Sequence, residues 1–243
     1  MSRQVVVIPT YNEIENIGGI VTAVISLKPE FDILIVDDNS PDGTGNKVKD
    51  LSDSFPNRII LEVRQEKSGL GTAYIHGFKK AIELGYDYIF EMDADFSHDP
   101  NDLLKLWKAC EQDGYDLAVG SRYVSGVNVV NWPMGRMLMS YFASVYVRLV
   151  TGLDIADTTA GFKCYKREVL ETINLDNIKF VGYAFQIEMK FIAWKYGFKI
   201  VEIPIIFTDR VKGQSKMSRG IFKEAVLGVI QMKIRSWFNY YTR

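Results

Sequence analysis

Two aspartates near the middle of the chain, Asp93 and Asp95, have the residue type and the spacing to bind a metal ion. They follow an apolar run, 86–90, that predicts a buried strand, and residues two apart on an extended chain point to the same face. Carboxylates that converge in this way repel each other unless a cation lies between them. Mg²⁺ and Mn²⁺ prefer oxygen ligands, often one or two carboxylates together with substrate phosphates. The alternative is a solvated acidic turn before a helix that starts near Pro100.

Apolar runs alternate with segments of helical periodicity along the chain. Near-continuous apolar strands are typical of a parallel sheet that is covered on both faces, so we expect one α/β domain with a mainly parallel sheet. In the first half, strands are expected at 5–9, 31–36, 58–63, 86–90 and 116–119, and helices from a cap at Asn12 to residue 25, after Thr44 to residue 52, at 73–84 and at 101–112. In the second half, helices are expected at 132–150, 183–196 and 221–238, and strands at 161–165 and 199–207.

Polar side chains follow four of the expected strands. Because ligands bind at the carboxyl ends of parallel strands, these side chains should meet on one rim of the sheet, as in an active site. At the second strand end, Asp38 could hydrogen-bond a ribose hydroxyl, by analogy with dinucleotide-binding folds, and an ordinary turn aspartate is an equal alternative. The rim residues are Tyr11, Asn12, Glu13, Asp37, Asp38, Asp93, Asp95, Ser121 and Arg122.

Composition limits the classes of protein that fit. With 243 residues, 47% of them apolar, the chain can bury a large core. The apolar window 137–147 is too short to span a bilayer, and the N-terminus lacks the pattern of a signal peptide. Cys110 and Cys164 have neither metal-binding nor redox spacing, so we expect reduced structural thiols in a cytosolic protein.

Charge is distributed unevenly. The segment from Arg210 to the end holds eight Lys or Arg and one Glu, a net charge of +7, so the rest carries −8 against a whole-chain charge of −1. A basic tail on an acidic body favours an anionic partner. The sequence contains no nucleic-acid-binding motif, so we expect substrate phosphates or a membrane surface and no nucleic acid. Gly69 and Gly71 lack the spacing of a dinucleotide-binding fingerprint.

Six motifs along the chain stand out: Val7–Glu13, Val36–Thr44, Met92–Asp95, Gly161–Tyr165, Gly182–Met189 and Arg210–Lys216. The first three resemble the family 2 inverting glycosyltransferases, whose GT-A fold is a Rossmann-like domain that binds nucleotide sugars. Within that family, the last three resemble the polyprenyl-phosphate (dolichyl-phosphate) mannose synthases. The resemblance covers about residues 4 to 218.

The resemblance implies a role for each matching residue. A divalent metal, Mg²⁺ or Mn²⁺, would be bound by Asp93 and Asp95. Ser97 stands where the family often has a Gln that completes the metal shell, and the neighbouring His98 is more often a turn residue than a ligand. GDP-mannose would contact Pro9, Tyr11, Glu13, Val36, Asp38, Asp93, Ala94, Asp95 and Lys216. The acceptor phosphate would contact Arg122, Arg136, Ser140 and Arg210, and catalysis would depend most on Asp95, Arg122 and Arg210.

The spacing of two acceptor residues agrees with this assignment. Arg136 and Ser140 are four apart, so on a helix they share one face, where a guanidinium and a hydroxyl suit a phosphate. Since a lipid phosphate is already anionic, it needs no general base, unlike a sugar hydroxyl. We expect one displacement that inverts the anomeric carbon. Gln186 offers an amide where a base would otherwise be sought, with Glu188 nearby.

Two other functions fit parts of the sequence. Another family 2 transferase would use a different donor or acceptor, such as UDP-glucose with polyprenyl phosphate, or a glycan or protein acceptor. A regulatory domain that binds nucleotides or accepts phosphate also has paired aspartates after strands. Such a domain would be about half as long and would not need the basic second half.

The final helix, 221–238, combines apolar residues with lysines, arginines and aromatic residues. This composition suits an amphipathic helix at a membrane surface, or one that docks a membrane-spanning partner subunit, and packing on the sheet is the alternative. We therefore expect a transferase domain at 1–218 and a membrane-surface or partner-binding helix at 219–243. The expected location is cytoplasmic, peripheral on the cytosolic face of a membrane.

Overall fold

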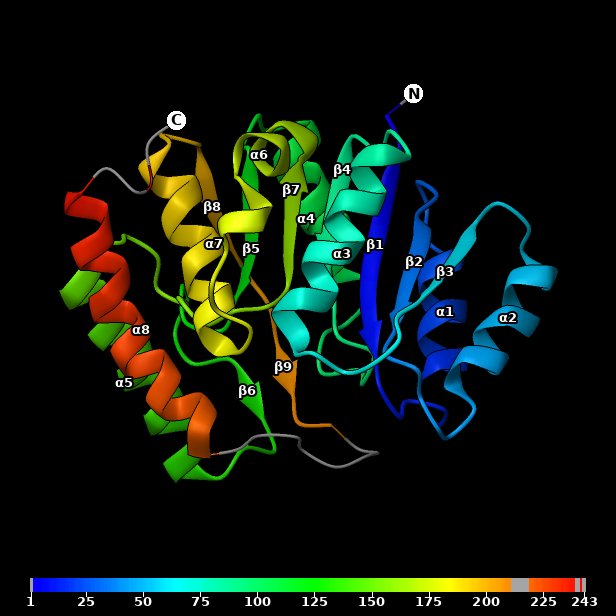
Figure 1. Cartoon of the computed structure of the whole chain (residues 1–243), viewed down its shortest axis with the longest axis horizontal. Helices are drawn as coiled ribbons and strands as arrows, with labels where there is room; N and C mark the ends of the chain where they lie inside the picture. Colours follow the sequence, from blue (N-terminus) through cyan, green and yellow to red (C-terminus); the bar gives the residue numbers. More distant parts are fainter. Residues whose placement is uncertain (1, 211–218, 239–240, 242–243) are drawn as a thin grey trace.

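A seven-stranded mixed sheet runs through the centre of the molecule in the order β3-β2-β1-β4-β7-β5-β8 (Figure 1). The computed structural model describes residues 2–210, 219–238 and 241. Within these residues, β7 runs antiparallel to both of its neighbours, and the other six strands of this sheet are parallel to one another. The strands are β1 (Gln4–Thr10), β2 (Asp32–Asp37), β3 (Ile59–Val63), β4 (Tyr88–Glu91), β5 (Leu117–Ser121), β7 (Lys163–Lys166) and β8 (Ile200–Pro204).

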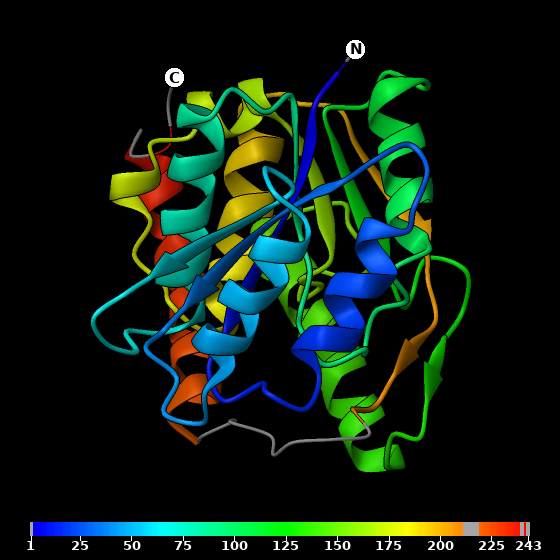
Figure 2. The same ribbon diagram turned by 90° about the vertical axis from the view of Figure 1, so that its right-hand side faces the viewer.

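Helices cover both faces of this sheet, as the two perpendicular views show (Figures 1 and 2). Each central strand contributes to both cores because successive side chains point to opposite faces: Val5 and Val7 belong to one core, and Val6 and Ile8 to the other. The first core is covered by α3 (Leu70–Glu83), α6 (Arg167–Thr172) and α7 (Tyr183–Lys195). The second is covered by α1 (Ile17–Ile25), α2 (Thr44–Ser54) and α4 (Asp102–Glu111).

Two long helices, α5 (Met134–Thr151) and α8 (Arg219–Trp237), lie side by side at one end of the molecule (Figure 1). The Tyr146 hydroxyl of α5 donates to the Val226 carbonyl of α8 at 2.9 Å. On α8, Val229 and Met232 are buried, whereas Trp237 remains exposed. The inner face of α8 therefore packs onto the domain while its outer face meets solvent.

Short elements complete the fold. β6 (Val129–Val130) and β9 (Phe207–Thr208) form a small parallel pair beyond the carboxyl end of the main sheet (Figure 1). A 3₁₀ helix, η1 (Leu175–Asn177), precedes α7. No helix among the residues that the structure describes is long and apolar enough to cross a membrane.

The predicted α/β class and mainly parallel sheet are confirmed, and the main elements lie within a few residues of the predicted positions. The predicted helix cap at Asn12 is wrong. Asn12 has a φ of 57° and donates its backbone N–H to the Ser40 hydroxyl, and α1 begins only at Ile17. The predicted strand 199–207 is also wrong as one element, because it divides into β8 and the start of β9.

The antiparallel strand has a direct effect on the rim. Since β7 runs opposite to its neighbours, its first residue, Lys163, lies at the edge where the other strands end. Lys163 pairs in register with Glu91, the last residue of β4, and with Val119 of β5. A lysine is thus placed among the carboxyl ends of parallel strands.

The close approach of α3 to the sheet depends on Gly77. A Cβ at this position would clash with the Val7 side chain and lie 3.2 Å from Val36 Cγ2. We expect Gly77→Ala to lower the free energy of unfolding by about 1–3 kcal/mol through overpacking, although alanine favours helices. Gly135→Ala in α5 is the matched control, since its Cβ would meet nothing within 4 Å and should raise stability slightly. Urea unfolding measures both, and equal effects would contradict the packing argument.

Candidate active site

Asp93 and Asp95 follow β4 at the carboxyl edge of the sheet, as the sequence predicted, and both have polar partners. The Tyr74 hydroxyl of α3 donates to Asp93 Oδ1 at 3.2 Å. Asp95 Oδ2 lies 3.0 Å from Arg210 Nη2, and the backbone N–H of Ser97 donates to Asp95 Oδ1 at 3.0 Å. The arginine comes from the segment after β9, so this pair connects two distant parts of the chain.

The chemistry of this carboxylate pair fits a divalent cation. Burial and the adjacent Asp95 charge raise the pKa of Asp93 to about 7, so an ionised pair is costly without a positive neighbour. In the described part of the chain, no three His, Cys, Asp or Glu side chains converge on one point. A metal at this edge would therefore have two carboxylates as its acidic protein ligands, which leaves coordination positions for substrate phosphates.

Of the two residues that follow these carboxylates, Ser97 hydrogen-bonds to Asp95 and His98 packs against aromatic rings. The Ser97 hydroxyl donates to Asp95 and is buried. His98 is stacked on Phe162, with ring centroids 4.8 Å apart, and meets Phe207 edge-on at 5.2 Å. Burial lowers the pKa of His98 to about 4, so its ring packs as a neutral aromatic group within the bend that follows Asp95.

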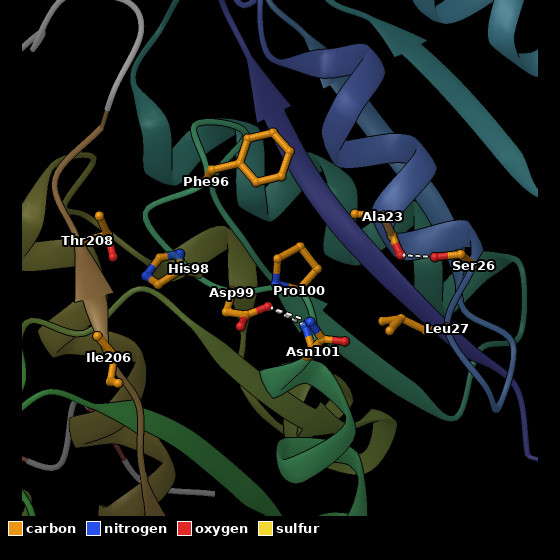
Figure 3. Close-up of a pocket in the computed structure, with 10 residues that line it drawn as sticks. All are labelled: Ala23, Ser26, Leu27, Phe96, His98, Asp99, Pro100, Asn101, Ile206 and Thr208. Atoms are coloured by element: carbon orange, nitrogen blue, oxygen red, sulfur yellow. Dashed lines mark hydrogen bonds between the residues drawn. The ribbon is translucent and has the colours of Figure 1, made fainter.

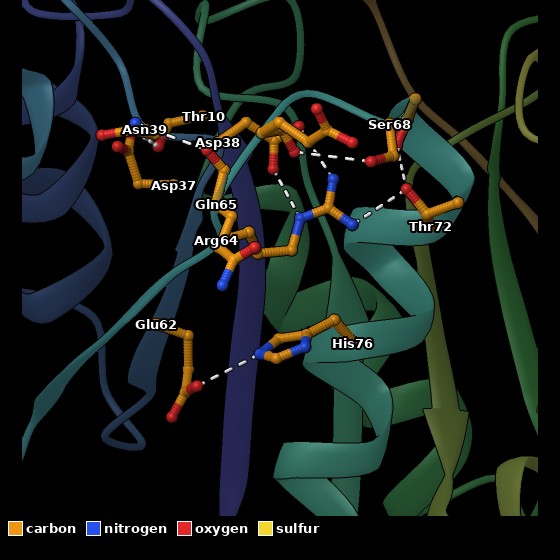
Figure 4. A network of polar contacts seen from close by, with 12 residues as sticks. Thr10, Asp37, Asp38, Asn39, Glu62, Arg64, Gln65, Ser68, Thr72 and His76 are labelled. Atoms are coloured by element: carbon orange, nitrogen blue, oxygen red, sulfur yellow. Dashed lines mark hydrogen bonds and ion pairs between the residues drawn. The ribbon is translucent and has the colours of Figure 1, made fainter.

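The ends of β2 and β3 carry a second polar network (Figure 4). Arg64 donates to both oxygens of Asp38, from Nε to Oδ1 at 2.6 Å and from Nη2 to Oδ2 at 2.8 Å, and its Nη1 donates to the Thr72 hydroxyl. Asp37 accepts from the Thr10 hydroxyl at 2.7 Å and from the Ser40 backbone N–H. Asp38 is therefore a carboxylate fixed by an arginine.

The other predicted nucleotide residues lie near this network with different exposures. Pro9 and Tyr11 are half-buried, and Lys67 Nζ lies 4.5 Å from the centre of the Tyr11 ring. Glu13 anchors the turn before α1 by accepting from the Asn16 side-chain amide at 3.0 Å. The Val36 side chain is fully buried in the core, so only its backbone can face a ligand.

Arg122 follows β5 and is held by an acid that the sequence did not single out. Its backbone N–H, Nε and Nη2 donate to the Asp157 carboxylate at 3.0, 2.6 and 2.6 Å, and Nη2 also donates to the Thr159 hydroxyl at 2.8 Å. Burial alone would raise the pKa of Asp157, but the Arg122 charge and hydrogen bonds hold it below its ordinary value. The guanidinium is fixed in position by this loop.

The predicted acceptor residues of α5 also have partners. Arg136 Nη1 lies 2.8 Å from Asp209 Oδ1, and its guanidinium lies 4.2 Å from the centre of the Trp132 ring. Ser140 Oγ accepts from the Tyr123 hydroxyl at 2.8 Å. Tyr123 and Trp132 also lie within 5.4 Å of the Arg122 guanidinium, which joins all these residues in one cluster.

Arg210 connects the two halves of the site, which are the carboxylate pair Asp93 and Asp95 and the cluster that holds Arg122, Arg136 and Ser140. It pairs with Asp95, and the preceding residue, Asp209, pairs with Arg136. Lys216, predicted to meet the donor diphosphate, lies outside the described residues. Of the predicted site residues that are described, the structure brings Asp93, Asp95 and Arg210 together, and it brings Arg122, Arg136 and Ser140 together around Tyr123 and Trp132.

A pocket of about 500 Å³ lies beside the loop that follows Asp95 (Figure 3). Its walls come from α1, from the loop before α4 and from the segment around β9. The lining does not include Asp93, Asp95 or the arginines, so this pocket is separate from the polar site. The lining residues are Ala23, Ser26, Leu27, Phe96, His98, Asp99, Pro100, Asn101, Ile206 and Thr208.

Residues 5–173 match the model of glycosyl transferase family 2. The chain belongs to glycosyl transferase family 2. The transferase is 46% identical to a polyprenol monophosphomannose synthase of Mycolicibacterium smegmatis over 96% of this chain and 88% of that protein. It is 45% identical to an undecaprenyl-phosphate mannosyltransferase of Micrococcus luteus, with 93% and 92% covered. The predicted resemblance to this group is confirmed, and the chain is a glycosyltransferase.

Solved structures confirm the GT-A fold of this family 2 glycosyltransferase. Glucosyl-3-phosphoglycerate synthase from Mycobacterium tuberculosis, in complex with phosphoglyceric acid, superposes with a TM-score of 0.71 over 95% of this chain and 80% of that one, at 14% identity. The same enzyme with Mn²⁺, uridine diphosphate and glucosyl-3-phosphoglycerate gives 0.68, with 97% and 79% covered and 15% identity. At such low identity, the likeness shows the fold alone.

Sequence reasoning missed the side chains that fix the transferase's rim residues. Asp157, Arg64 and Asp209 each hold one of the predicted residues, but they stand in loops or at a strand end without periodicity. Tyr123 directly follows Arg122 and was also missed. One signal was available: a buried arginine at a strand end requires an acid, and Asp157 is followed by two threonines that can support a polar loop.

Because Asp157 neutralises the buried Arg122, we expect Asp157→Asn to lower the free energy of unfolding by about 3–5 kcal/mol at pH 7. The folded pKa of Asp157 is lowered, so its contribution is complete above the unfolded pKa of about 3.9 and is lost as pH falls below it toward the folded value. The difference between wild type and variant should therefore be constant above about pH 5 and shrink below about pH 4.

Urea unfolding across this pH range measures the effect. Asp176→Asn is the matched control, because its pair with Lys79 is exposed and should contribute less than about 1 kcal/mol. A difference for Asp157→Asn that stays constant down to pH 2 would contradict the linkage.

Proposed function

We propose that this enzyme transfers mannose from GDP-mannose to a polyprenyl phosphate such as dolichyl phosphate, and that it forms the β-mannosyl phosphate and GDP. The observation that supports it most is that three arginines, Arg122, Arg136 and Arg210, lie at the edge of the sheet that also carries the paired carboxylates, with Arg210 against Asp95. A reaction between two phosphate-bearing substrates needs cationic hydrogen-bond donors of this kind. The relatives named for polyprenyl and undecaprenyl phosphate support the same substrate class.

On the donor side, we propose that GDP-mannose binds across the ends of β1, β2 and β4. Tyr11 and Asp38 would contact the nucleoside, with Asp38 using the lone pairs that Arg64 leaves open. The remaining donor contacts are proposed at Pro9, Glu13, the backbone of Val36, Asp93, Ala94, Asp95 and Lys216.

A divalent Mg²⁺ or Mn²⁺ ion would be held by Asp93 and Asp95, with Ser97 as the proposed third protein ligand. When bound, such an ion stabilises the charge that develops on the leaving GDP. The raised pKa of Asp93 supports this assignment, because a cation removes the repulsion between the two carboxylates. Arg210 holds part of that compensating charge at Asp95.

On the acceptor side, we propose that Arg122, Arg136, Arg210 and Ser140 bind the lipid phosphate. An anionic oxygen attacks the anomeric carbon of mannose in one displacement, so the configuration inverts and no covalent enzyme intermediate forms. Glu188 supports the absence of a general base: it is fully buried and accepts from the Lys179 backbone N–H and the Tyr241 hydroxyl. The Glu188 carboxylate therefore holds Lys179 and Tyr241 in place and is not directed at a substrate hydroxyl.

The acceptor's lipid tail calls for a bilayer beside this site, and we propose that the outer faces of α5 and α8 contact it. Phe142 on α5 is 60% exposed, and Phe238 after α8 is 79% exposed. Exposed aromatic and aliphatic side chains suit the membrane interface. The exposed apolar residues are Met134, Leu138, Met139, Tyr141, Phe142 and Leu149 on α5, and Leu227, Ile230, Ile234, Trp237 and Phe238 on or just after α8.

Three related predictions stay predictions. They are a location on the cytosolic face of a membrane, docking to a membrane-spanning partner subunit, and the division of the chain into 1–218 and 219–243.

The proposed reaction is tested by incubating the enzyme with labelled GDP-mannose and polyprenyl phosphate in detergent. We expect a chloroform-soluble mannosyl lipid that forms only with Mg²⁺ or Mn²⁺ and disappears with a chelator. Asp95→Asn should lower the rate at least about 100-fold, because loss of charge stabilisation in the transition state costs about 3 kcal/mol or more.

Each outcome of this assay bears on a separate part of the proposal. If product forms from a UDP-sugar and not from GDP-mannose, the proposed donor is wrong and the proposed acceptor is retained. Transfer to a glycan or protein but not to a lipid phosphate would assign the arginines to another acceptor and refute the proposed synthase activity. Asp99→Asn, an exposed acid four residues further on, is the control and should keep its activity.

The membrane contact is tested by co-sedimentation with liposomes that contain anionic lipids. We expect the double variant Met139→Ser and Phe142→Ser to bind several-fold more weakly, because buried apolar area contributes about 25 cal/mol per Å². Val63→Ser, at an exposed apolar site on β3 far from α5, is the control. Deleting α8 is a poorer test, because Val229 and Met232 would leave the core. Unchanged binding of the double variant would remove α5 from the contact surface.

A further inference from the structure

A buried lysine, Lys163, contacts the first turn of α7 through Gln186. Its Nζ donates to Gln186 Oε1 and lies 3.0 Å from Glu91 Oε1. Lys163 and Glu91 are both fully buried, and the Tyr165 hydroxyl also donates to Glu91 at 2.8 Å. The strand register explains the pair, since the start of antiparallel β7 lies beside the end of β4.

This contact fixes which end of the Gln186 amide faces Lys163. An ammonium group has donors and no acceptor, so the amide must turn its oxygen toward Nζ. The nitrogen, Nε2, then points away from Lys163, and a Cβ added at Gly161 would lie 3.2 Å from it. Within the described residues, Nε2 makes no hydrogen bond. An amide donor therefore stands beside Gly161 with its hydrogens unused by the protein.

The two residues that flank this donor, Gly161 and Lys163, each lead to a different part of the site. Gly161 ends the loop whose earlier residues, Asp157 and Thr159, hold the Arg122 guanidinium. On the other side, the Lys163 ammonium is close enough to Asp93 for their charges to interact. In Figure 1, the start of α7 lies at the carboxyl edge of the sheet, where β6 and β9 also lie.

Stability alone does not explain the buried ion pair between Lys163 and Glu91. Replacing a buried pair by apolar residues of similar size is often neutral or stabilising, because two charges lose their hydration on burial. Exchanging Lys163 and Glu91 together for apolar residues should therefore cost the fold mainly the hydrogen bond that the Tyr165 hydroxyl gives to Glu91. Holding the orientation of the Gln186 amide is a role that apolar residues would not perform.

We propose that Gln186 donates a hydrogen bond from Nε2 to the phosphate of the acceptor, and that Lys163, held by Glu91, is a positioning residue that keeps this donor turned toward the substrate. The inference rests on the proposed function and specifies its acceptor: a donor at this point suits an anion, whereas a hydroxyl acceptor would need a base there. The remaining charge on the phosphate would be met by Arg122, Arg136 and Arg210, the arginines proposed above for the acceptor.

Three variants test the proposal by steady-state kinetics with varied polyprenyl phosphate. Gln186→Leu removes the donor, and kcat/KM for the lipid phosphate should fall roughly 10- to 100-fold, as expected for a lost hydrogen bond to a charged group, while KM for GDP-mannose stays unchanged. Gln186→Glu keeps a contact with Lys163 but places a negative charge beside the phosphate, so the loss should be larger.

The third variant, Lys163→Met with Glu91→Leu, removes both buried charges together and leaves Gln186 in place without its orienting contact. It should lower kcat/KM for the acceptor nearly as much as Gln186→Leu, and adding Gln186→Leu to it should cost little more, because the residues act as one unit. A purely structural role would change the unfolding temperature without this coupling. Gln112→Leu, at an exposed position after α4, is the matched control.

The possible results separate the inference from the proposed function. If the wild-type enzyme makes no lipid-linked product, the proposed function and the inference both fail. If it makes product and Gln186→Leu retains the wild-type kcat/KM for the acceptor, only the inference fails. Full activity of the Lys163→Met, Glu91→Leu variant would refute the positioning role, and this result does not depend on whether Gln186→Leu folds.

Discussion

Opposite charges held in pairs determine how the carboxyl edge of this sheet is built. Burial makes an uncompensated charge costly, so most acids and arginines on this rim have a partner of opposite charge, whereas Asp93, whose pKa is raised, accepts from the Tyr74 hydroxyl. Asp38 has Arg64, Asp95 has Arg210, and Asp157 holds Arg122. Glu91 with Lys163 and Arg136 with Asp209 complete the same pattern. The partner of each rim residue comes from a different strand end or loop, so the fold and the site depend on one another.

Although the short elements β6, α6 and η1 were missed, the sequence was sufficient to predict the α/β class, the order of the main elements and the convergence of the strand ends. Each of these features follows from local patterns: apolar runs for buried strands, helical spacing, and the Asp93-Ala-Asp95 spacing. Partnerships across the rim were not predictable in this way. Asp157 holds Arg122 from 35 residues away, in a loop with no periodicity, and no local pattern in one sequence encodes that distance.

The direction of β7 and the start of α1 show two other limits. The residues of a short strand such as 161–165 do not show in which direction it runs, so the antiparallel placement of Lys163 could not be read from the sequence. Asn12 has the residue type of a helix cap, but the same type tolerates positive φ, and the turn at Asn12 uses that property. The sequence also did not show that His98, which lies in a bend, stacks its ring on Phe162.

Asp209 and Arg210 are consecutive residues, and their ion pairs reach opposite halves of the rim: Asp209 to Arg136 on α5, and Arg210 to Asp95 after β4. The backbone at these two residues therefore lies between the α5 arginine and the carboxylate after β4. A shift of this backbone would move the Asp209 and Arg210 side chains together and act on both ion pairs at once.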